Sequence, residues 1–365
     1  MPQPTREDVL AALGTVQDPD LKRDLVTLGM IEDLTVADGA VRFTLVLTTA
    51  ACPLKDQLER EVRAAVDAVA GVRSVEFKTT ARVRKARDPA ADRKAIAGVA
   101  HVIAIGSGKG GVGKSTVSAN LAVSLAAAGA RVGLLDGDIY GPNLPRMLGL
   151  HRQPSTRDGR ILPPEAWGVR FMSMGLLVDE GQAVVWRGPM LHGAIKQFLH
   201  DVEWGELDYL LVDLPPGTGD VQLSLVQHTA VDGAVVVTTP SAVAVDDAVK
   251  AISMFKMLHV PLLGLIENMS YFICPDCSSR HEIFGSGAGE ARARELDVPF
   301  LGAVPIHPDV RAGGDRGRPV VADRPDSDYA RALTRISGHL AQRVSIQTFG
   351  DPASAPAAPA APAAS

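Results

Sequence analysis

A glycine-rich phosphate-binding motif in the first half of the chain constrains the fold more than any other feature. Residues 108–116 read GKGGVGKST and follow the apolar segment Val102–Ile105 closely. They satisfy the pattern G-x-x-x-x-G-K-[ST] in the strand-to-helix context that it requires. The glycines let consecutive backbone N–H groups turn toward phosphate oxygens, and a helix that begins near Ser115 directs its positive end at the same charge. The motif therefore predicts a nucleoside triphosphate site.

Each residue of the motif has an expected role. Lys114 reaches the β- and γ-phosphates, Ser115 offers its hydroxyl to Mg²⁺, and Thr116 contacts the region of the α-phosphate. The rest of the loop forms the phosphate cradle with its backbone, and consists of Gly108, Gly110, Gly111, Val112 and Gly113. The alternative is a glycine-rich turn that binds nothing, which the strand-to-helix context disfavours.

From His101 onward, short apolar segments alternate with stretches of helical pattern. Such continuous apolar runs are typical of strands that are buried on both faces, as in a parallel sheet. We therefore predict a doubly wound, mostly parallel α/β P-loop domain over residues 98–345. Its expected strands are Val102–Ile105, Val132–Leu135, Tyr209–Val212, Ala234–Val237, Leu262–Ile266 and Phe300–Val304.

The 365 residues are enough for a second, smaller domain before the motif. Residues 1–81 contain two helical patterns, at Arg6–Val16 and from Leu54 to Val69, and the alternating strand Val41–Leu47. Ile31–Val36 is expected to pair with that strand in a hairpin, because an Asp-Gly step lies between them. A basic linker over 82–97 and a disordered Ala/Pro tail over 346–365 complete the predicted organisation.

Composition excludes several classes of protein. Lys and Arg number 37 against 42 Asp and Glu, so the net charge of −5 gives no general electrostatic reason to bind nucleic acid or an anionic membrane. No apolar run is long enough to span a bilayer. The three cysteines are too few for a disulfide framework and fit a reducing compartment. We expect a cytoplasmic protein with no nucleic-acid or membrane partner.

Polar side chains follow three of the predicted strands. Asp136 and Asp138 come after the strand that begins at Val132, and Asp213 ends the strand that begins at Tyr209. Ligand sites in open α/β sheets form at this edge, and a carboxylate there can hold Mg²⁺, usually through water. Asn268 follows a later strand, and its amide can pair with an adenine edge. The sequence therefore predicts Asp213 and Asn268 as nucleotide-binding residues.

Cys274 and Cys277 form a C-x-x-C pair, which can grip one metal centre but leaves a four-coordinate site half filled. The residues alone leave several interpretations open. These are an iron–sulfur site, a zinc site completed by His281 or by a second subunit, a thioredoxin-like redox pair, and a turn without a ligand. Cys52, in the small domain, is equally compatible with a buried or capping thiol.

Four strings together resemble one family over nearly all of residues 1–345. They are GKGGVGKST, DGDIYGPNLPRMLG, DLPPGTGD and ENMSYFICPDC. The chain resembles the Mrp/NBP family of deviant Walker A P-loop ATPases, the Mrp/ApbC-type iron–sulfur cluster carriers. Residues 1–81 resemble the SufT-like metal–sulfur assembly module that is often fused to this ATPase.

The resemblance implies further roles at matching positions. Lys109 resembles the signature lysine that reaches the partner's phosphates in a nucleotide-sandwich homodimer. Asp138 corresponds to the switch I aspartate that positions the attacking water, although it could instead only cap a turn. Pro215 and Gly217 resemble switch II, whose motion reports hydrolysis. The implied activity is Mg²⁺-dependent hydrolysis of ATP to ADP and phosphate.

The implied function is that of a cluster carrier. If the signature lysine imposes a two-fold homodimer, Cys274 and Cys277 of both chains can hold one bridging [4Fe-4S] cluster. The cluster would pass to apo iron–sulfur proteins, with cluster assembly factors as further partners. The rival is a MinD/ParA-type positioning or partition switch, which leaves the cysteine pair without a role. Electron transfer as in nitrogenase reductase is disfavoured, because that family's ligand positions near switch II carry no cysteine here.

Overall fold

The computed structural model describes residues 3–85, 94–139, 141–177 and 188–350, and every structural statement below concerns these residues. The chain divides into two compact units, which are described separately. One comprises Met1–Arg87 with Ala341–Ser365, and the other comprises Asp88–Leu340.

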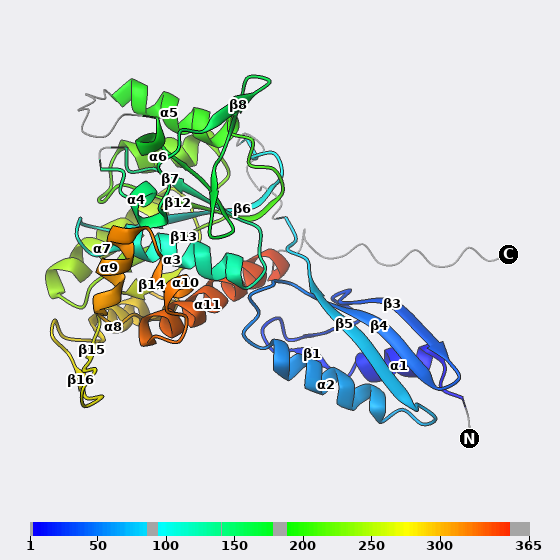
Figure 1. Cartoon of the computed structure of the whole chain (residues 1–365). Coiled ribbons are helices and arrows are strands. Elements are labelled where there is room, and N and C mark those ends of the chain that lie inside the picture. The colour runs from blue at the N-terminus through cyan, green and yellow to red at the C-terminus, as the bar shows by residue number, and fades with distance from the viewer. Residues whose placement is uncertain (1–2, 86–93, 140, 178–187, 351–365) are drawn as a thin grey trace. The chain divides into compact units, whose positions relative to one another are not determined.

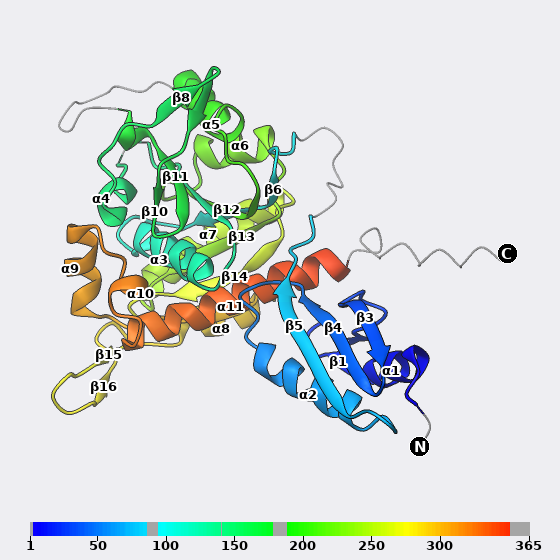
Figure 2. The ribbon, with the colours of Figure 1, turned by 45° about the vertical axis from the view of Figure 1, so that its right-hand side comes forward.

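The larger unit is built on one eight-stranded sheet (Figures 1 and 2). All neighbouring strands pair in parallel except the edge pair β10–β11, which is antiparallel. The fold class predicted from the sequence is therefore confirmed, and all six expected strands lie in this sheet. Their order is β10 (Glu165–Ala166), β11 (Val169–Ser173), β7 (Val132–Asp136), β12 (Leu207–Asp213), β6 (Val99–Gly106), β13 (Gly233–Thr238), β14 (Leu262–Glu267) and β17 (Phe300–Ala303).

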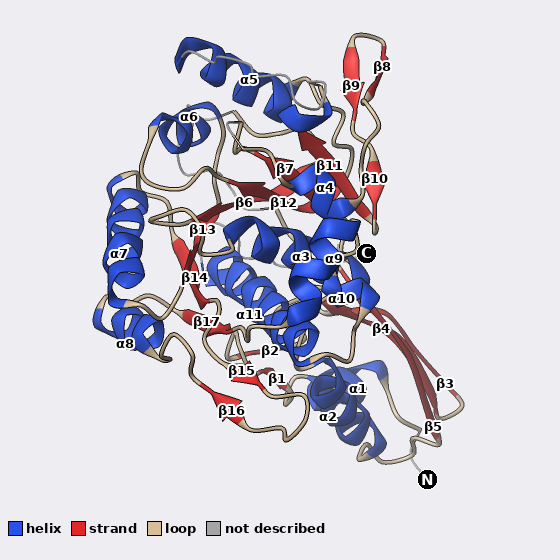
Figure 3. Ribbon diagram, turned by 60° about the vertical axis from the view of Figure 1, so that its left-hand side comes forward, coloured by secondary structure: helices blue, strands red, loops and turns tan. Residues whose placement is uncertain are grey.

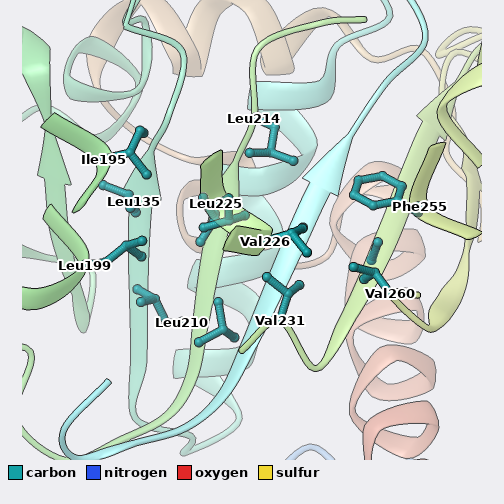
Figure 4. Packing of buried hydrophobic residues seen from close by; sticks show 14 of the residues in the cluster. Leu135, Ile195, Leu199, Leu210, Leu214, Leu225, Val226, Val231, Phe255 and Val260 are labelled. Carbon is teal, nitrogen blue, oxygen red and sulfur yellow. The ribbon is translucent and has the colours of Figure 1, made fainter. Parts of the chain in front are cut away.

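Helices pack on both faces of this sheet (Figure 3). One hydrophobic core cluster lies between the sheet and the helices on one of its faces (Figure 4). The strands contribute alternate residues to it, such as Leu210 and Val212 of β12, and the helices contribute Leu225, Phe255 and other side chains. Residues 211 and 213 of β12 face the other way, toward α3, whose Ser118 contacts Asp213. The helices of the cluster are α5 (Gly188–His200), α6 (Asp220–His228), α7 (Ala242–Met257) and α8 (Ala288–Glu295), and α3 is Lys114–Ala127.

Shorter elements complete this unit. They are α4 (Leu144–Leu148), β8 (Ser155–Arg157), β9 (Arg160–Leu162), the 3₁₀ turn Met174–Leu176, β15 (Phe272–Ile273), β16 (Arg280–His281), α9 (Pro308–Arg316), α10 (Val320–Asp323) and the first part of α11 (Asp328–Gly350). None of the described helices is long and apolar enough to cross a membrane.

The smaller unit has a three-stranded sheet and two helices. Strands β3 (Ile31–Ala37) and β4 (Ala40–Leu47) form the expected antiparallel hairpin, and β5 (Ser74–Ala81) pairs in parallel with β4. The hairpin turns at Asp38 and Gly39, both with positive φ, as the Asp-Gly step predicts. The remaining elements are α1 (Arg6–Leu13), α2 (Lys55–Asp67) and the short pair β1 (Gln17–Asp18) and β2 (Arg23–Asp24).

The two described ends of the predicted linker differ, because Arg82 is exposed whereas Ile96 is buried. Arg82 forms an ion pair with Glu32 at 2.6 Å, and Ile96 is buried in the core of the larger unit. Residues 86–93 of the linker lie outside the described residues.

The expected tail, 346–365, is wrong in its first five residues. Helix α11 continues to Gly350, because Phe349 packs on the core of the smaller unit and Arg84 lies 4.9 Å from the centre of its ring. Residues 351–365, which include the Ala/Pro repeats, lie outside the described residues.

Candidate nucleotide site and cysteine hairpin

The loop between β6 and α3 has the backbone geometry of a phosphate cradle. Gly111 and Gly113 adopt φ values of 82° and 81°, which side-chain-bearing residues rarely adopt. A Cβ on Gly108 would lie 2.1 Å from the backbone carbonyl of Asp247 in α7. Gly113 caps the N-terminus of α3, so the first amides of that helix point into the same loop.

A buried polar network lies directly beneath this loop. The Lys114 Nζ is 2.8 Å from Oδ2 of Asp213, a carboxylate that is completely buried. The Ser115 hydroxyl donates to the same oxygen at 2.6 Å, and the Ser118 hydroxyl donates to Oδ1 at 2.6 Å. The structure thus brings together three predicted residues, Lys114, Ser115 and Asp213, and adds Ser118.

A second buried carboxylate lies on the neighbouring strand. Asp136 of β7 is in register with Asp213 of β12, and it accepts hydrogen bonds from Ser173 Oγ at 3.1 Å and from the Asp138 amide at 3.2 Å. Burial, together with the charge of Asp213, raises the pKa of Asp136 well above its ordinary value. Asp138 is half-buried, and its carboxylate accepts from the Gly141 amide at 3.3 Å.

The segment after Asp213 is hydrogen-bonded to the phosphate loop. The Gly217 amide donates to the carbonyl of Ser107 at 2.9 Å, and the Ser107 hydroxyl donates to the carbonyl of Lys109 at 3.1 Å. Buried Gln222 donates to the carbonyls of Pro215 and Gly217 at 2.9 and 3.0 Å. Pro215, Gly217 and Lys109 therefore belong to one connected loop system. A change in the phosphate loop can reach all three residues.

A cavity of about 650 Å³ opens beside the N-terminus of α3. Asn268, Thr116 and Gly113 line it together with Phe284 and Tyr329. Asn268 donates to the carbonyl of Val112 at 2.9 Å, which leaves its carbonyl oxygen and one N–H for a ligand. The Tyr329 hydroxyl is buried and has no hydrogen-bond partner among the residues that the structure describes.

The oxygen donors beneath the loop suit a magnesium ion. Ser115 Oγ and the Asp213 carboxylate lie 2.6 Å apart at the carboxyl end of a parallel strand. Mg²⁺ in nucleotide sites takes a hydroxyl, a carboxylate, waters and phosphate oxygens. The donor set therefore fits Mg²⁺ that arrives with a bound nucleotide.

The cysteine pair lies in a short hairpin between β15 and β16. The Cys274 amide donates to the carbonyl of Ser279 at 3.0 Å, and the Ser278 amide donates to the carbonyl of Cys274 at 2.9 Å. Cys277 is exposed and Cys274 is partly exposed. Among the described residues, no group of three or more His, Cys, Asp or Glu side chains is placed to hold a metal ion. His281 is therefore not grouped with the two cysteines in this described part of the chain.

The three cysteines should differ in reactivity. Hydrogen bonds from Ser279 and Cys274 lower the pKa of Cys277, whereas burial raises the pKa of Cys52. We expect iodoacetamide to modify Cys277 before Cys52 in the metal-free protein near pH 7.5. The difference between the two alkylation rates should narrow as pH rises, because a larger fraction of Cys52 then becomes thiolate. Peptide mass spectrometry after timed alkylation measures this order, and equal rates for the two thiols would contradict the assignment.

Four residues of the site were not predicted from the sequence. Ser118 carried a usable signal, because it follows Lys114 by one helical turn and must share its face. Glu267 carried the same signal as Asn268, because it directly follows the predicted strand Leu262–Ile266. Phe284 and Tyr329 carried none, since their positions depend on segments that approach one another only in the folded chain. All four lie on the nucleotide site or next to it.

Comparison with protein families identifies the larger unit. The model described as NUBPL iron-transfer P-loop NTPase matches residues 98–341, which is more than half of the chain. The chain belongs to this family. A second model, described as iron-sulfur cluster assembly protein, matches residues 6–77. The resemblance drawn from the motifs is confirmed by both matches.

Relatives of this NTPase extend over nearly the whole chain. The iron-sulfur cluster carrier proteins of Synechocystis sp. and Deinococcus radiodurans are 50% and 52% identical, each over 94% of this chain and 98% and 97% of their own. The protein of the same name from Escherichia coli is 40% identical over 95% of this chain and 94% of its own.

Two solved structures that are similar to this chain contain bound nucleotide. The nucleotide-binding protein from Archaeoglobus fulgidus in complex with ADP is 39% identical, with a TM-score of 0.55 over 63% of this chain and 90% of its own. The septum site-determining protein MinD from Pyrococcus horikoshii, complexed with Mg-ADP, is 27% identical. Its TM-score is 0.50, and the match covers 65% of this chain and 94% of the MinD chain. These similarities agree with the P-loop NTPase fold.

Proposed function

We propose that this protein is an ATP-dependent iron–sulfur cluster carrier. It binds and hydrolyses ATP with Mg²⁺ in residues 98–345, holds a [4Fe-4S] cluster between two chains and passes it to apo-proteins. The observation that carries the proposal is the pair of Cys277, which is exposed, and Cys274, which is partly exposed, in a P-loop NTPase, without a third ligand among the described residues. The name of the relatives from three bacteria supports the same cargo.

In the nucleotide half, the chain positions and polarises the phosphates. Lys114 leaves Asp213 and neutralises the β- and γ-phosphates, while Ser115 and Asp213 would hold Mg²⁺. Water attacks the γ-phosphorus, the bond to the β–γ bridging oxygen breaks, and Asp138 orients that water. The charge that develops on the transferred group is stabilised by the loop amides, Lys114 and Lys109 of the opposing chain.

In the base half, Asn268 and Thr116 face the cavity beside the phosphate loop. Because one N–H of Asn268 is used by Val112, its free carbonyl oxygen accepts from the exocyclic amine of adenine. The remaining N–H of Asn268 can donate to a ring nitrogen of the same base, so the amide matches the donor and the acceptor on an adenine edge.

The cluster is cargo held by few ligands. One chain supplies two thiolates, so a four-iron cluster needs a second copy for the other two. A homodimer with two-fold symmetry, in which Lys109 reaches across, provides them. A site at the surface with two ligands from each chain exposes the cluster to an acceptor's thiolates. Residues 1–81 would engage apo-proteins or assembly factors.

Anaerobic reconstitution with iron and sulfide tests the cargo. We expect the wild type to develop the broad thiolate-to-iron absorbance near roughly 400 nm and the double variant Cys274→Ser/Cys277→Ser to lack it. Cys52→Ser is the matched control and should retain the absorbance, because Cys52 lies in the other unit. Zinc with no iron in the wild type, or an unchanged band in the double variant, would contradict a cluster at this pair.

A further inference from the structure

One buried carboxylate closes the segment that carries the cysteine pair. Glu267, at the end of β14, has no exposed surface. Its Oε1 accepts from the Ser270 hydroxyl at 2.6 Å and from the Gly287 amide at 2.8 Å, and its Oε2 accepts from the Gly289 amide at 2.6 Å. Ser270 precedes the hairpin, and the two glycines follow it at the start of α8. The hairpin is thus fastened at both ends to one side chain.

The fit around this carboxylate is tight. A Cβ on Gly289 would lie 2.9 Å from Oε2 of Glu267, so the approach requires glycine. The negative charge also lies at the N-terminus of α8, where the helix dipole stabilises it. Hydrogen bonds from neutral donors to a charged acceptor are stronger than those to a neutral one. Glu267 therefore holds the two ends of the hairpin more firmly than an amide would.

The next residue in the chain contacts the nucleotide site. Asn268 donates from its side chain to the carbonyl of Val112 in the phosphate loop. It also donates from its backbone to the carbonyl of Thr238 at 2.8 Å. Two consecutive residues therefore hold two different loops, with Glu267 on the cysteine hairpin and Asn268 on the phosphate loop.

The closed segment also forms part of the wall of the nucleotide cavity. Phe284, between β16 and α8, lines the cavity with Met269 and remains 55% exposed. Its neighbour Ile283 is 57% exposed and does not line the cavity. On the other side of the hairpin, the Ile306 amide donates to the carbonyl of Tyr271 at 2.6 Å, and Ile306 is also a lining residue. A planar ring exposed to this cavity is suited to packing against a purine.

We propose that Glu267 and Phe284 couple nucleotide occupancy to the conformation of the cysteine hairpin. Phe284 packs on the bound base, and Glu267, a positioning residue, transmits this ordering because it ties both ends of the hairpin next to Asn268. This inference rests on one part of the proposed function, namely that the cavity binds a nucleotide. It adds that nucleotide controls access to Cys274 and Cys277 before any cluster is present.

Maleimide labelling of the metal-free, full-length chain tests this coupling. In a Cys52→Ser background, only the hairpin thiols remain to react. We expect saturating MgADP to slow their labelling by roughly tenfold at constant pH, the size of one hydrogen bond to a charged group. Phe284→Ala should abolish the nucleotide effect on labelling, whereas Ile283→Ala, which removes a neighbouring exposed side chain of similar exposure, should keep it.

Variants of Glu267 distinguish its role in positioning the cysteine hairpin from a general loss of structure. Glu267→Gln should speed labelling without nucleotide and remove the response to MgADP, while Glu290→Gln on the exposed side of α8 should change neither. If Glu267→Gln fails to fold by circular dichroism, Ser270→Ala removes one of the three contacts and should weaken the response. An unchanged response in the folded Glu267 variant, or in Ser270→Ala where it replaces that variant, would overturn the proposal.

Calorimetric titration with MgADP distinguishes failure of the coupling from failure of the proposed function. Binding by the wild type without any change in labelling overturns the coupling and leaves the proposed function intact. Absence of MgADP binding overturns both. Loss of the response in Phe284→Ala with binding retained supports the coupling, and loss of the response in Ile283→Ala as well contradicts a specific role for Phe284.

Discussion

Phosphate release from ATP is expected to fall at least about 100-fold when Lys114 is replaced by methionine. Lys114 is the buried cation of the phosphate loop, and it lies 2.8 Å from Asp213 beneath that loop. Methionine keeps much of the length of the side chain but cannot neutralise the charge that develops on the transferred phosphoryl group. A malachite-green assay of released phosphate measures the effect.

The same substitution should also destabilise the nucleotide-free protein. Removing one partner of a buried ion pair leaves an uncompensated charge, which costs about 3–5 kcal/mol of unfolding free energy. Adding Asp213→Asn to Lys114→Met should recover stability but not hydrolysis, because the two changes act on one pair. Lys250→Met on the exposed face of α7 is the control for charge and should alter neither property. Retained hydrolysis in Lys114→Met would rule out the P-loop assignment.

Gly108→Ala is expected to produce the largest structural effect of any single methyl group in the phosphate loop. Its Cβ would lie 2.1 Å from the carbonyl carbon and oxygen of Asp247 and 2.5 Å from the Ala248 amide nitrogen. These are backbone atoms of α7, so relief requires the loop and the helix to separate. We expect a loss of about 3 kcal/mol in unfolding free energy. Denaturant titration measures that loss, and calorimetry should show no MgADP binding.

Gly110→Ala provides the matched control in the same loop. The nearest atom to a Cβ at this position is Pro216 Cγ at 3.9 Å, an ordinary van der Waals contact. The unfolding free energy of this variant should change by less than about 1 kcal/mol. Equal destabilisation by the two alanines would show that contact with α7 does not determine the requirement for glycine at position 108.

The sheet was predictable where its strands are continuous apolar runs, because burial on both faces leaves no room for polar alternation. Strand β11 was not predicted, because it is not a continuous apolar run. Its Arg170 is half-buried and donates to the carbonyl of Trp204, so a charge interrupts the apolar pattern at a place where the fold satisfies it. Strand β11 pairs with β7 on one side and only with the two-residue edge strand β10 on the other, so it can carry a polar group near the edge of the sheet.

Candidate site residues could be named from the sequence where one short segment carries a motif. The phosphate loop and the C-x-x-C pair are motifs whose function depends on local spacing, so their residues can be named from the sequence. Glu267 and Tyr329 belong to the site only because α8, α11 and the cavity wall come together in three dimensions. The sequence places Glu267 after a strand but does not show which amides it accepts from, and the tyrosine at the start of a helix has no distinctive neighbours in the chain.

Both oxygens of the Asp213 carboxylate are already engaged by donors of the chain itself, from Lys114, Ser115 and Ser118. A free magnesium ion would have to compete with an internal ammonium group for this carboxylate. In the proposed mechanism, bound phosphates would remove that competitor, because they would draw the lysine toward themselves and leave an oxygen of Asp213 open. The metal would then enter as a complex with the nucleotide, and the internal ion pair would protect the empty protein from occupation by divalent cations alone.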